Sequence, residues 1–178
     1  MIDHLSYSSI SMYLDCPEAW QRKYVLNEPT RKTSALAFGS AFHGTVEQMV
    51  QGPVVMADVW KDEFEKAFNH EISLDADETR EQFYNEGIRL LSHADVQKVI
   101  GEIRPKMDTA GAMIERRVEL RVPGVNVPIV GYIDVVLEDG TPADFKTSAR
   151  SWTQDQASNS LQTLFYIAAL NQAGFDVN

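Results

Sequence analysis

The spacing of the hydrophobic residues changes along the chain, and this change limits the folds that it can adopt. Over roughly the first 110 residues they recur every three or four positions, as in Phe38, Phe42 and Val46, a pattern typical of amphipathic helices. From Ile114 the spacing becomes two, which is typical of β-strands with one buried face. We therefore predict an α/β fold whose helices precede its strands in the sequence.

Three strands and a final helix are predicted in the last part of the chain. The strands are expected at about residues 114–122, 129–137 and 141–147. The helix is expected at about residues 156–172, and Gly174 is placed to end it. The strands are close enough in sequence to form hairpins.

The length of 178 residues and the 44% hydrophobic content fit one domain, residues 1–178. We expect a mainly helical part over residues 1–110 and a β-hairpin core with the last helix over residues 111–178. Residues 175–177, Phe-Asp-Val, are expected to begin a further strand.

The composition limits the kinds of metal site that the chain can form and its location in the cell. The longest apolar run, residues 164–170, is far shorter than the roughly 20 residues of a membrane helix, so we expect a cytoplasmic protein that does not enter a membrane. The single cysteine, Cys16, cannot form an internal disulfide or, alone, a zinc or iron–sulfur site. We expect Cys16 to be buried, and any metal to be held by oxygen and imidazole.

A net charge of −10 argues against a nucleic-acid partner, because phosphate binding normally needs a basic surface. The excess is local, however. Residues 58–86 contain ten acids and three bases, which leaves 16 acids and 13 bases elsewhere. The charge therefore excludes nucleic acid less strongly than the total suggests.

Two aspartates and a lysine near the predicted hairpin form the clearest candidate site. If residues 138–140 make a three-residue loop with Gly140 in the left-handed conformation, Asp134 faces Asp144 on the next strand. Their Cβ atoms would then lie roughly 5 Å apart. Because alternate strand residues share a face, Lys146 is expected beside Asp144, with Phe145 on the opposite, apolar face.

Two carboxylates this close repel each other, and a divalent cation would offset the repulsion. Hard oxygen ligands favour Mg²⁺ or Mn²⁺, which can activate water for attack on a phosphate. The same pattern also fits a surface hairpin with an incidental acid pair and a solvated lysine. The hairpin alone does not decide between these interpretations.

Four blocks of the chain, in the same order, resemble the RecB-type branch of the PD-(D/E)XK nuclease superfamily. The first has a serine-rich start, a Cys-Pro and aromatic residues, and the second carries His43. The third is the hairpin, with Ile133-Asp134 in place of Pro-Asp, and the fourth matches a QxxxY motif. These blocks are residues 5–24, 38–47, 134–146 and 162–166.

The resemblance implies roles for individual residues. His43, Asp134, Asp144 and the Phe145 carbonyl would bind the metal, and Lys146 would orient or deprotonate the attacking water. Gln162 and Tyr166 would contact DNA or support the site; the alternative is that Tyr166 is only a core residue. The candidates for an extra carboxylate near the metal are Glu115, Glu119 and Glu47.

The resemblance also implies a restriction-endonuclease-like core, with a central mixed sheet of about three to five strands flanked by helices. It implies a bacterial or phage-encoded deoxyribonuclease that depends on Mg²⁺ or Mn²⁺, and an exonuclease in recombination, repair or phage DNA processing more than a site-specific endonuclease. DNA is the expected substrate, with a helicase or recombination protein as a further partner. No iron–sulfur cluster is expected, because Cys16 lacks partner cysteines. The alternative is a catalytically silent DNA-binding or protein-assembly module.

Overall fold

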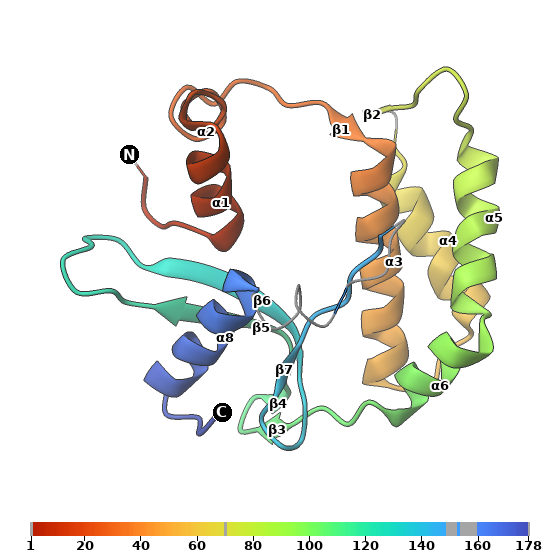
Figure 1. Cartoon of the computed structure of the whole chain (residues 1–178). Helices are drawn as coiled ribbons and strands as arrows, with labels where there is room; N and C mark the ends of the chain where they lie inside the picture. The colour runs from red at the N-terminus through yellow and green to blue at the C-terminus, as the bar shows by residue number, and fades with distance from the viewer. Residues whose placement is uncertain (1, 70, 149–152, 154–159, 178) are drawn as a thin grey trace. The chain divides into compact units, whose positions relative to one another are not determined.

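A computed structural model describes residues 2–69, 71–148, 153 and 160–177 of the chain. The chain combines helices with small β-sheets, and most of its helices precede the main strands, so the predicted α/β fold class is confirmed. Figure 1 shows these elements: α1 (Tyr7–Asp15), α2 (Pro17–Tyr24), β1 (Lys32–Thr33), α3 (Ser34–Gln51), α4 (Met56–Ala67), β2 (Ile72–Ser73), α5 (Arg80–Leu91), α6 (Ala94–Glu102), β3 (Met107–Asp108), β4 (Gly111–Ala112), β5 (Ile114–Leu120), β6 (Ile129–Val136), β7 (Pro142–Ala143) and α8 (Leu161–Gln172).

The chain folds into two compact units, each of which contains more than one stretch of sequence. Unit 1 consists of Met1–Thr30, Lys106–Asp144 and Ser148–Asn178, and unit 2 of Arg31–Pro105 and Phe145–Thr147. Helices α1 and α2 therefore belong with β3–β7 and α8, and not with α3–α6. A single domain over residues 1–178 stays a prediction.

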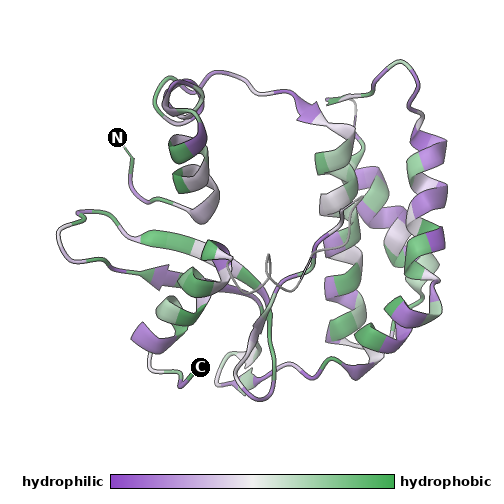
Figure 2. Ribbon diagram, in the orientation of Figure 1, coloured by the Kyte–Doolittle hydropathy of each residue, from purple (hydrophilic) through white to green (hydrophobic). Residues whose placement is uncertain are grey.

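The main sheet of unit 1 has the order β5-β6-β7, and its neighbouring strands are antiparallel. Leu5 adds a parallel bridge to Ile129 at the start of β6. Ile133, Val135 and Val136 of β6 are fully buried, and Figure 2 shows this strand as largely hydrophobic. The apolar side of the sheet thus forms the core of unit 1.

The loop that joins β6 and β7 has the predicted geometry. Val135 pairs with Ala143 and Val136 with Pro142, and the Leu137 amide donates to the Thr141 carbonyl at 2.8 Å. Gly140 has a φ of +92°, a conformation that glycine adopts at little cost. The predicted register of this hairpin is confirmed.

Helix α8 packs on the sheet of unit 1 and is held there at its end. The Gln172 side chain accepts from the Arg121 amide at 2.7 Å and donates to the Arg121 carbonyl at 3.0 Å. Gly174, with a φ of +90°, follows the helix as predicted. Residues 156–159 of the predicted helix lie outside the described residues.

The N-terminal helices are capped by local side chains. Ser6 and Ser9 form a reciprocal capping box at the start of α1, and Pro17 is the first residue of α2. Cys16 is exposed, so its predicted burial is wrong: its Sγ accepts from the Ala19 amide at 3.5 Å and caps α2. A cap must lie at the end of a helix, where solvent reaches it.

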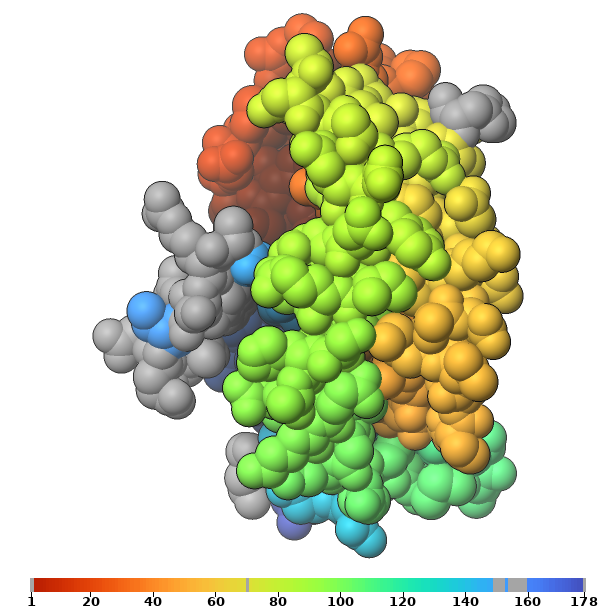
Figure 3. All heavy atoms as spheres, turned by 90° about the vertical axis from the view of Figure 1, so that its right-hand side faces the viewer, coloured from red at the N-terminus to blue at the C-terminus, as the bar shows by residue number. Residues whose placement is uncertain are grey.

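Unit 2 is a helical layer around a cluster of aromatic residues. Trp60 is fully buried and lies within 6 Å of the rings of Phe38 and Phe64. Figure 3 shows a face of this unit that α5 and α6 cover, with α4 beside them. The acidic segment 58–86 spans α4, α5 and the loops around β2, and several of its carboxylates pair with bases, as Glu65 does with Arg80 at 2.9 Å.

Two predicted strands are not formed as expected. The third strand comprises only Pro142–Ala143, and from Asp144 to Ser148 the chain has no regular structure. Residues 175–177 are not a strand, because both backbone polar groups of Val177 bond to the Asn171 side chain at 2.9 Å. None of the described helices is long and apolar enough to cross a membrane.

Candidate active site

Asp134 of β6 and Asp144, the residue after β7, adjoin the last paired residues of the hairpin in unit 1. Val135 and Ala143 are the last paired residues of β6 and β7, and the same register extended by one residue sets Asp134 opposite Asp144. Asp134 is only 8% exposed, and the Oδ2 atom of Asp144 is buried. Two carboxylates are thus brought together in a place where water screens their charges poorly.

Gln162 and Tyr166, one turn apart on α8, connect Asp144 to the backbone of β6. The Gln162 Nε2 donates to Asp144 Oδ1 at 3.0 Å and to the Tyr166 hydroxyl at 2.7 Å. The Tyr166 hydroxyl in turn donates to the Tyr132 carbonyl at 2.7 Å. This chain of hydrogen bonds fixes one oxygen of Asp144 relative to the strand that carries Asp134.

The pKa of the Tyr166 phenol depends on its burial and on the carboxylates around it. Burial raises the pKa of Tyr166 to about 12, although the hydrogen bond from Gln162 acts in the opposite direction. The negative charges of Asp144, Asp134 and Glu115 raise this pKa further. The three carboxylates therefore lie near enough to the phenol to act on it, and the hydroxyl keeps its proton at neutral pH.

Glu115 is the third of these carboxylates, and its backbone is unusual. Ile114 pairs with Val135 and Arg116 with Ile133, so Glu115 between them lies opposite Asp134 in the register. Its φ is +47°, in the left-handed region that costs a residue with a side chain roughly 1–3 kcal/mol. Such strain commonly occurs at functional sites, which singles out Glu115 on this strand.

The donor set of this cluster suits a hard divalent cation. Carboxylate oxygens and water are the ligands that Mg²⁺ prefers, and it often binds through only one or two carboxylates. Among the described residues, no three histidine, cysteine or acidic side chains form a complete metal site by themselves.

His43 and Phe145 come together in unit 2. The His43 ring, on α3, meets the Phe145 ring edge-on, with 6.2 Å between their centres. One helical turn earlier, the position of a Cβ on Gly39 would be 3.3 Å from the Thr147 hydroxyl. The predicted face of α3 that includes Gly39 and His43 thus lies along Phe145–Thr147.

This contact corrects one expectation about the third strand. Phe145 packs against the core of unit 2 and not beside Ile133, which belongs to the core of unit 1. Lys146 is exposed and lies after β7, which ends at Ala143, so its place beside Asp144 stays a prediction. The strand ends early since the chain passes from unit 1 to unit 2 after Asp144.

The other candidate carboxylates have different surroundings. Glu119 forms ion pairs with Arg117 at 2.7 Å and Arg121 at 3.7 Å on the outer part of β5. Glu47, on α3, accepts from the Gln51 side chain at 2.9 Å. Neither acts on the Tyr166 phenol in the way that Glu115 does.

Sequence reasoning overlooked two parts of this cluster. The Tyr132 carbonyl is the acceptor for Tyr166, and no side-chain pattern indicates a backbone acceptor. A Cβ on Gly131 would lie 2.5 Å from Phe165 Cε1 and 3.2 Å from Tyr166 Cε1, so α8 can approach β6 only over a glycine. A glycine inside a predicted strand is the signal that could have revealed this close approach.

Comparison with known proteins identifies a family. A family model described as the PD-(D/E)XK nuclease superfamily matches residues 4–177. No curated protein and no solved structure shows significant similarity to the chain.

Proposed function

Because the chain belongs to the PD-(D/E)XK nuclease superfamily, we propose that it hydrolyses DNA phosphodiester bonds with the aid of Mg²⁺ or Mn²⁺. The observation that carries the proposal is the facing pair of Asp134 and Asp144, with Asp144 held by Gln162. An acid pair that is built into a hairpin and tied to a neighbouring helix is unlike an incidental surface pair.

The carboxylates of Asp134 and Asp144 would hold the metal, with Glu115 as the third acidic group. A bound Mg²⁺ or Mn²⁺ would supply charge stabilisation on the phosphate and a lowered pKa for the attacking water. The hydrogen bonds from Gln162 and Tyr166 would keep Asp144 in place during substrate binding. A site held by a helix and a strand is well suited to this role, because small displacements are costly for catalysis.

We assign three further roles on the strength of the family motif. His43 and the Phe145 carbonyl are proposed metal ligands, and the Nζ of Lys146 is proposed to orient the attacking water or to accept its proton. Within unit 2, the contact between the His43 and Phe145 rings supports treating these two residues together. Contact of Gln162 and Tyr166 with DNA is proposed in addition to their support of Asp144.

The expected activity is that of an exonuclease in recombination, repair or phage DNA processing, in the cytoplasm of a bacterial cell. A helicase or recombination protein is the proposed partner. These finer assignments follow from the resemblance of the QxxxY motif, Gln162 to Tyr166, to the RecB-type branch. Resistance of a circular substrate that is cut readily after linearisation would support an exonuclease.

The test compares the wild type with Asp144→Asn and Lys146→Ala on end-labelled single- and double-stranded DNA, with Mg²⁺ or Mn²⁺ present. Glu138→Gln is the matched control, because it removes a carboxylate charge in the exposed loop of the same hairpin. We expect both site variants to lose activity and the control to retain it. Absence of cleavage by the wild type with either metal would contradict the proposal.

Two variants of one strand test which glutamate belongs to the site. Glu115 and Glu119 have the same residue type and the same strand parity, but only Glu115 lies opposite Asp134. Glu115→Gln should reduce cleavage, whereas Glu119→Gln should only remove ion pairs with two arginines. If wild-type protein bound DNA without cutting it, the alternative of a catalytically silent binding module would take the place of the proposal.

A further inference from the structure

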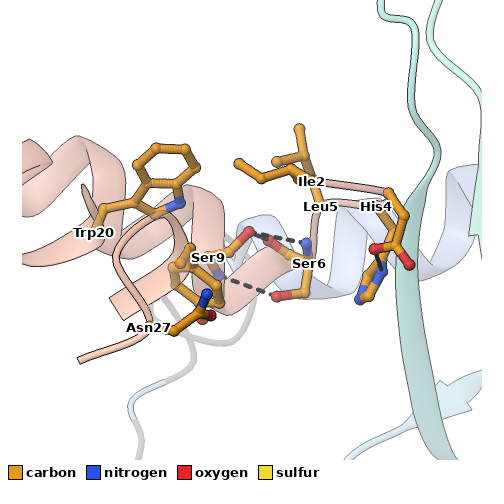
Figure 4. A pocket seen from close by; sticks show the side chains of 9 residues that line it. Ile2, His4, Leu5, Ser6, Ser9, Trp20 and Asn27 are labelled. Atoms are coloured by element: carbon orange, nitrogen blue, oxygen red, sulfur yellow. Dashed lines mark hydrogen bonds and ion pairs between the residues drawn. The ribbon is translucent and has the colours of Figure 1, made fainter. Parts of the chain in front are cut away.

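A pocket of unit 1 is built by the N-terminal segment and the helix pair α1 and α2, and the proposed chemistry makes no use of it. Its volume is about 250 Å³. Figure 4 shows Trp20 and His4 on opposite sides of the pocket, with Ser6 and Ser9 between them. It is lined by Ile2, Asp3, His4, Leu5, Ser6, Ser9, Trp20, Tyr24 and Asn27.

One wall of the pocket is aromatic and held in place. Trp20 contacts Tyr24 with 6.0 Å between ring centres, and Tyr13 meets Trp20 edge-on at 5.3 Å. Lys23 places its Nζ 5.2 Å from the centre of the Tyr24 ring. Aromatic rings beside a cation are the usual components of sites that stack the bases of single-stranded nucleic acid.

The polar groups of the pocket divide into rigid and available ones. The hydroxyls of Ser6 and Ser9 are engaged in the capping box of α1, so they form a fixed floor. The exposed Asn27 offers an amide that can both donate and accept, and His4 is paired with Asp3 at 2.7 Å. These groups suit a ligand whose edge carries both hydrogen-bond donors and acceptors.

Charge and size narrow the class of ligand. The hydrogen bond from His4 lowers the pKa of Asp3, so this carboxylate is ionised at neutral pH and would repel a phosphate. The volume is below the roughly 300–1,000 Å³ of sites for drug-sized ligands. A single flat ring with a polar edge, such as a nucleobase, meets both limits.

The pocket is tied to the strand that carries Asp134. The Leu5 amide donates to the Pro128 carbonyl at 2.9 Å, and the Val130 amide donates to the Leu5 carbonyl at 2.7 Å. From Ile129 to Asp134 is five residues of β6, or about 17 Å at roughly 3.4 Å per residue. A stacked strand rises about 3.4 Å per nucleotide, so this separation corresponds to at most about five nucleotides, and to fewer where the strand is unstacked.

We propose that the pocket holds one unstacked base of the DNA strand, within about five nucleotides of the phosphodiester bond that is cut. The proposal rests on the proposed function, because it assumes a DNA strand at Asp134 and Asp144. It adds a base-binding subsite on the opening helix pair. Trp20 would stack on the base, and Asn27 would contact its polar edge.

Single abasic substitutions, moved one position at a time from the labelled end of a single-stranded oligonucleotide, test the subsite. Binding is measured by fluorescence anisotropy with Ca²⁺ in place of Mg²⁺, and cleavage is measured separately with Mg²⁺ or Mn²⁺. We expect one or two positions, within about five nucleotides of the cut, at which loss of the base weakens binding about 5- to 150-fold. Trp20→Leu should weaken binding of the intact strand similarly and abolish this dependence on position.

Asn27→Gly is the second variant, because glycine retains the backbone conformation at a φ of +53° and removes only the amide side chain. It should weaken binding at the same position, so the test does not depend on the stability of the Trp20 variant. Leu26→Ala is the control: this neighbouring side chain is 58% exposed and does not line the pocket. It should bind as the wild type does.

The outcomes separate the subsite from the nuclease activity. If wild type cleaves DNA but no abasic position matters, or both pocket variants bind normally, the subsite is refuted and the nuclease proposal stands. If the position dependence and the effects of Trp20→Leu and Asn27→Gly are seen without any cleavage by wild type, the subsite stands and the nuclease proposal is refuted. Absence of all DNA binding by wild type refutes the subsite.

Discussion

Replacing Gly131 with alanine would place a methyl group between β6 and α8, where the structure leaves no room for it. The new Cβ would be 2.5 Å from Phe165 Cε1 and 3.2 Å from Tyr166 Cε1. Carbon atoms in contact are ordinarily about 3.5 to 4.0 Å apart, so the helix or its rings must move by about 1.0 to 1.5 Å. Phe165 and Tyr166 are buried, so this movement disturbs a packed core.

The same movement acts on the hydrogen bonds that hold Asp144. The bonds of the Tyr166 hydroxyl with Tyr132 and Gln162 are both 2.7 Å long, and about 1 Å of displacement would break them. Overpacking costs about 1–3 kcal/mol, while replacing a strand glycine by alanine returns about 0.5–1 kcal/mol. We expect a net loss of about 1–2 kcal/mol in the free energy of unfolding and a fall in cleavage rate on the order of 100-fold.

Denaturant unfolding and cleavage of an end-labelled strand measure the two effects of Gly131→Ala. Gly101→Ala is the control, because its new Cβ would meet no atom within 4 Å and alanine favours a helix by about 0.5–1 kcal/mol. It should stabilise the protein and leave the cleavage rate unchanged. Wild-type cleavage by a folded Gly131→Ala variant would refute the argument that the packing of α8 positions Asp144.

Three further predictions concern burial, ionisation and metal binding. Gly87→Ala puts a Cβ 2.0 Å from Trp60 Cζ2 and should cost at least about 1–3 kcal/mol in a denaturant titration. Because folding raises the pKa of Tyr166 to about 12, the phenol contributes fully to the free energy of unfolding below pH 10. This free energy should fall by about 1.4 kcal/mol per pH unit between pH 10 and 12, and the Tyr166→Phe variant should lack this fall. Mn²⁺ should raise the melting temperature of wild type, because binding at 100 times Kd adds about 2.7 kcal/mol of stability, and it should not raise that of Asp144→Asn. Without metal, Asp144→Asn should be more stable than wild type, because one of two repelling charges is removed. An equal Mn²⁺ shift in both proteins would contradict the assignment of Asp144 as a ligand.

The hairpin was predictable because its geometry is set locally. A three-residue loop with glycine at its last position fixes the register of the strands that flank it, and the structure has Leu137 bonded to Thr141 and Gly140 in the left-handed conformation. The position of Asp134 opposite Asp144 follows from that loop alone. No contact with a distant part of the chain was needed for this inference.

The conformation and packing of the residues after Asp144 could not be predicted in the same way. The sequence of residues 141–147 alternates like a strand, but Phe145 finds its apolar surroundings in unit 2, beside His43. This competition is between two cores that are distant in sequence, and strand periodicity contains no information about it. The prediction that Cys16 is buried was wrong for a related reason. Cysteine is usually buried, but here its side chain caps the start of α2 and is exposed there.

Glu115 and Glu119 are both candidates for an extra carboxylate near the metal, and strand alternation alone does not distinguish them. The two residues share a strand and a parity, so alternation assigns both to the same face. Only pairing with β6 distinguishes them: Glu119 pairs with Val130, whereas Glu115 lies opposite Asp134. The arginines at 117 and 121 then neutralise Glu119, and the charge of Glu115 acts on the Tyr166 phenol beside Asp134 and Asp144. Whether a strand glutamate is a candidate for this chemistry depends on the residue opposite it. The register of the two strands determines that residue, so residue type alone is not enough.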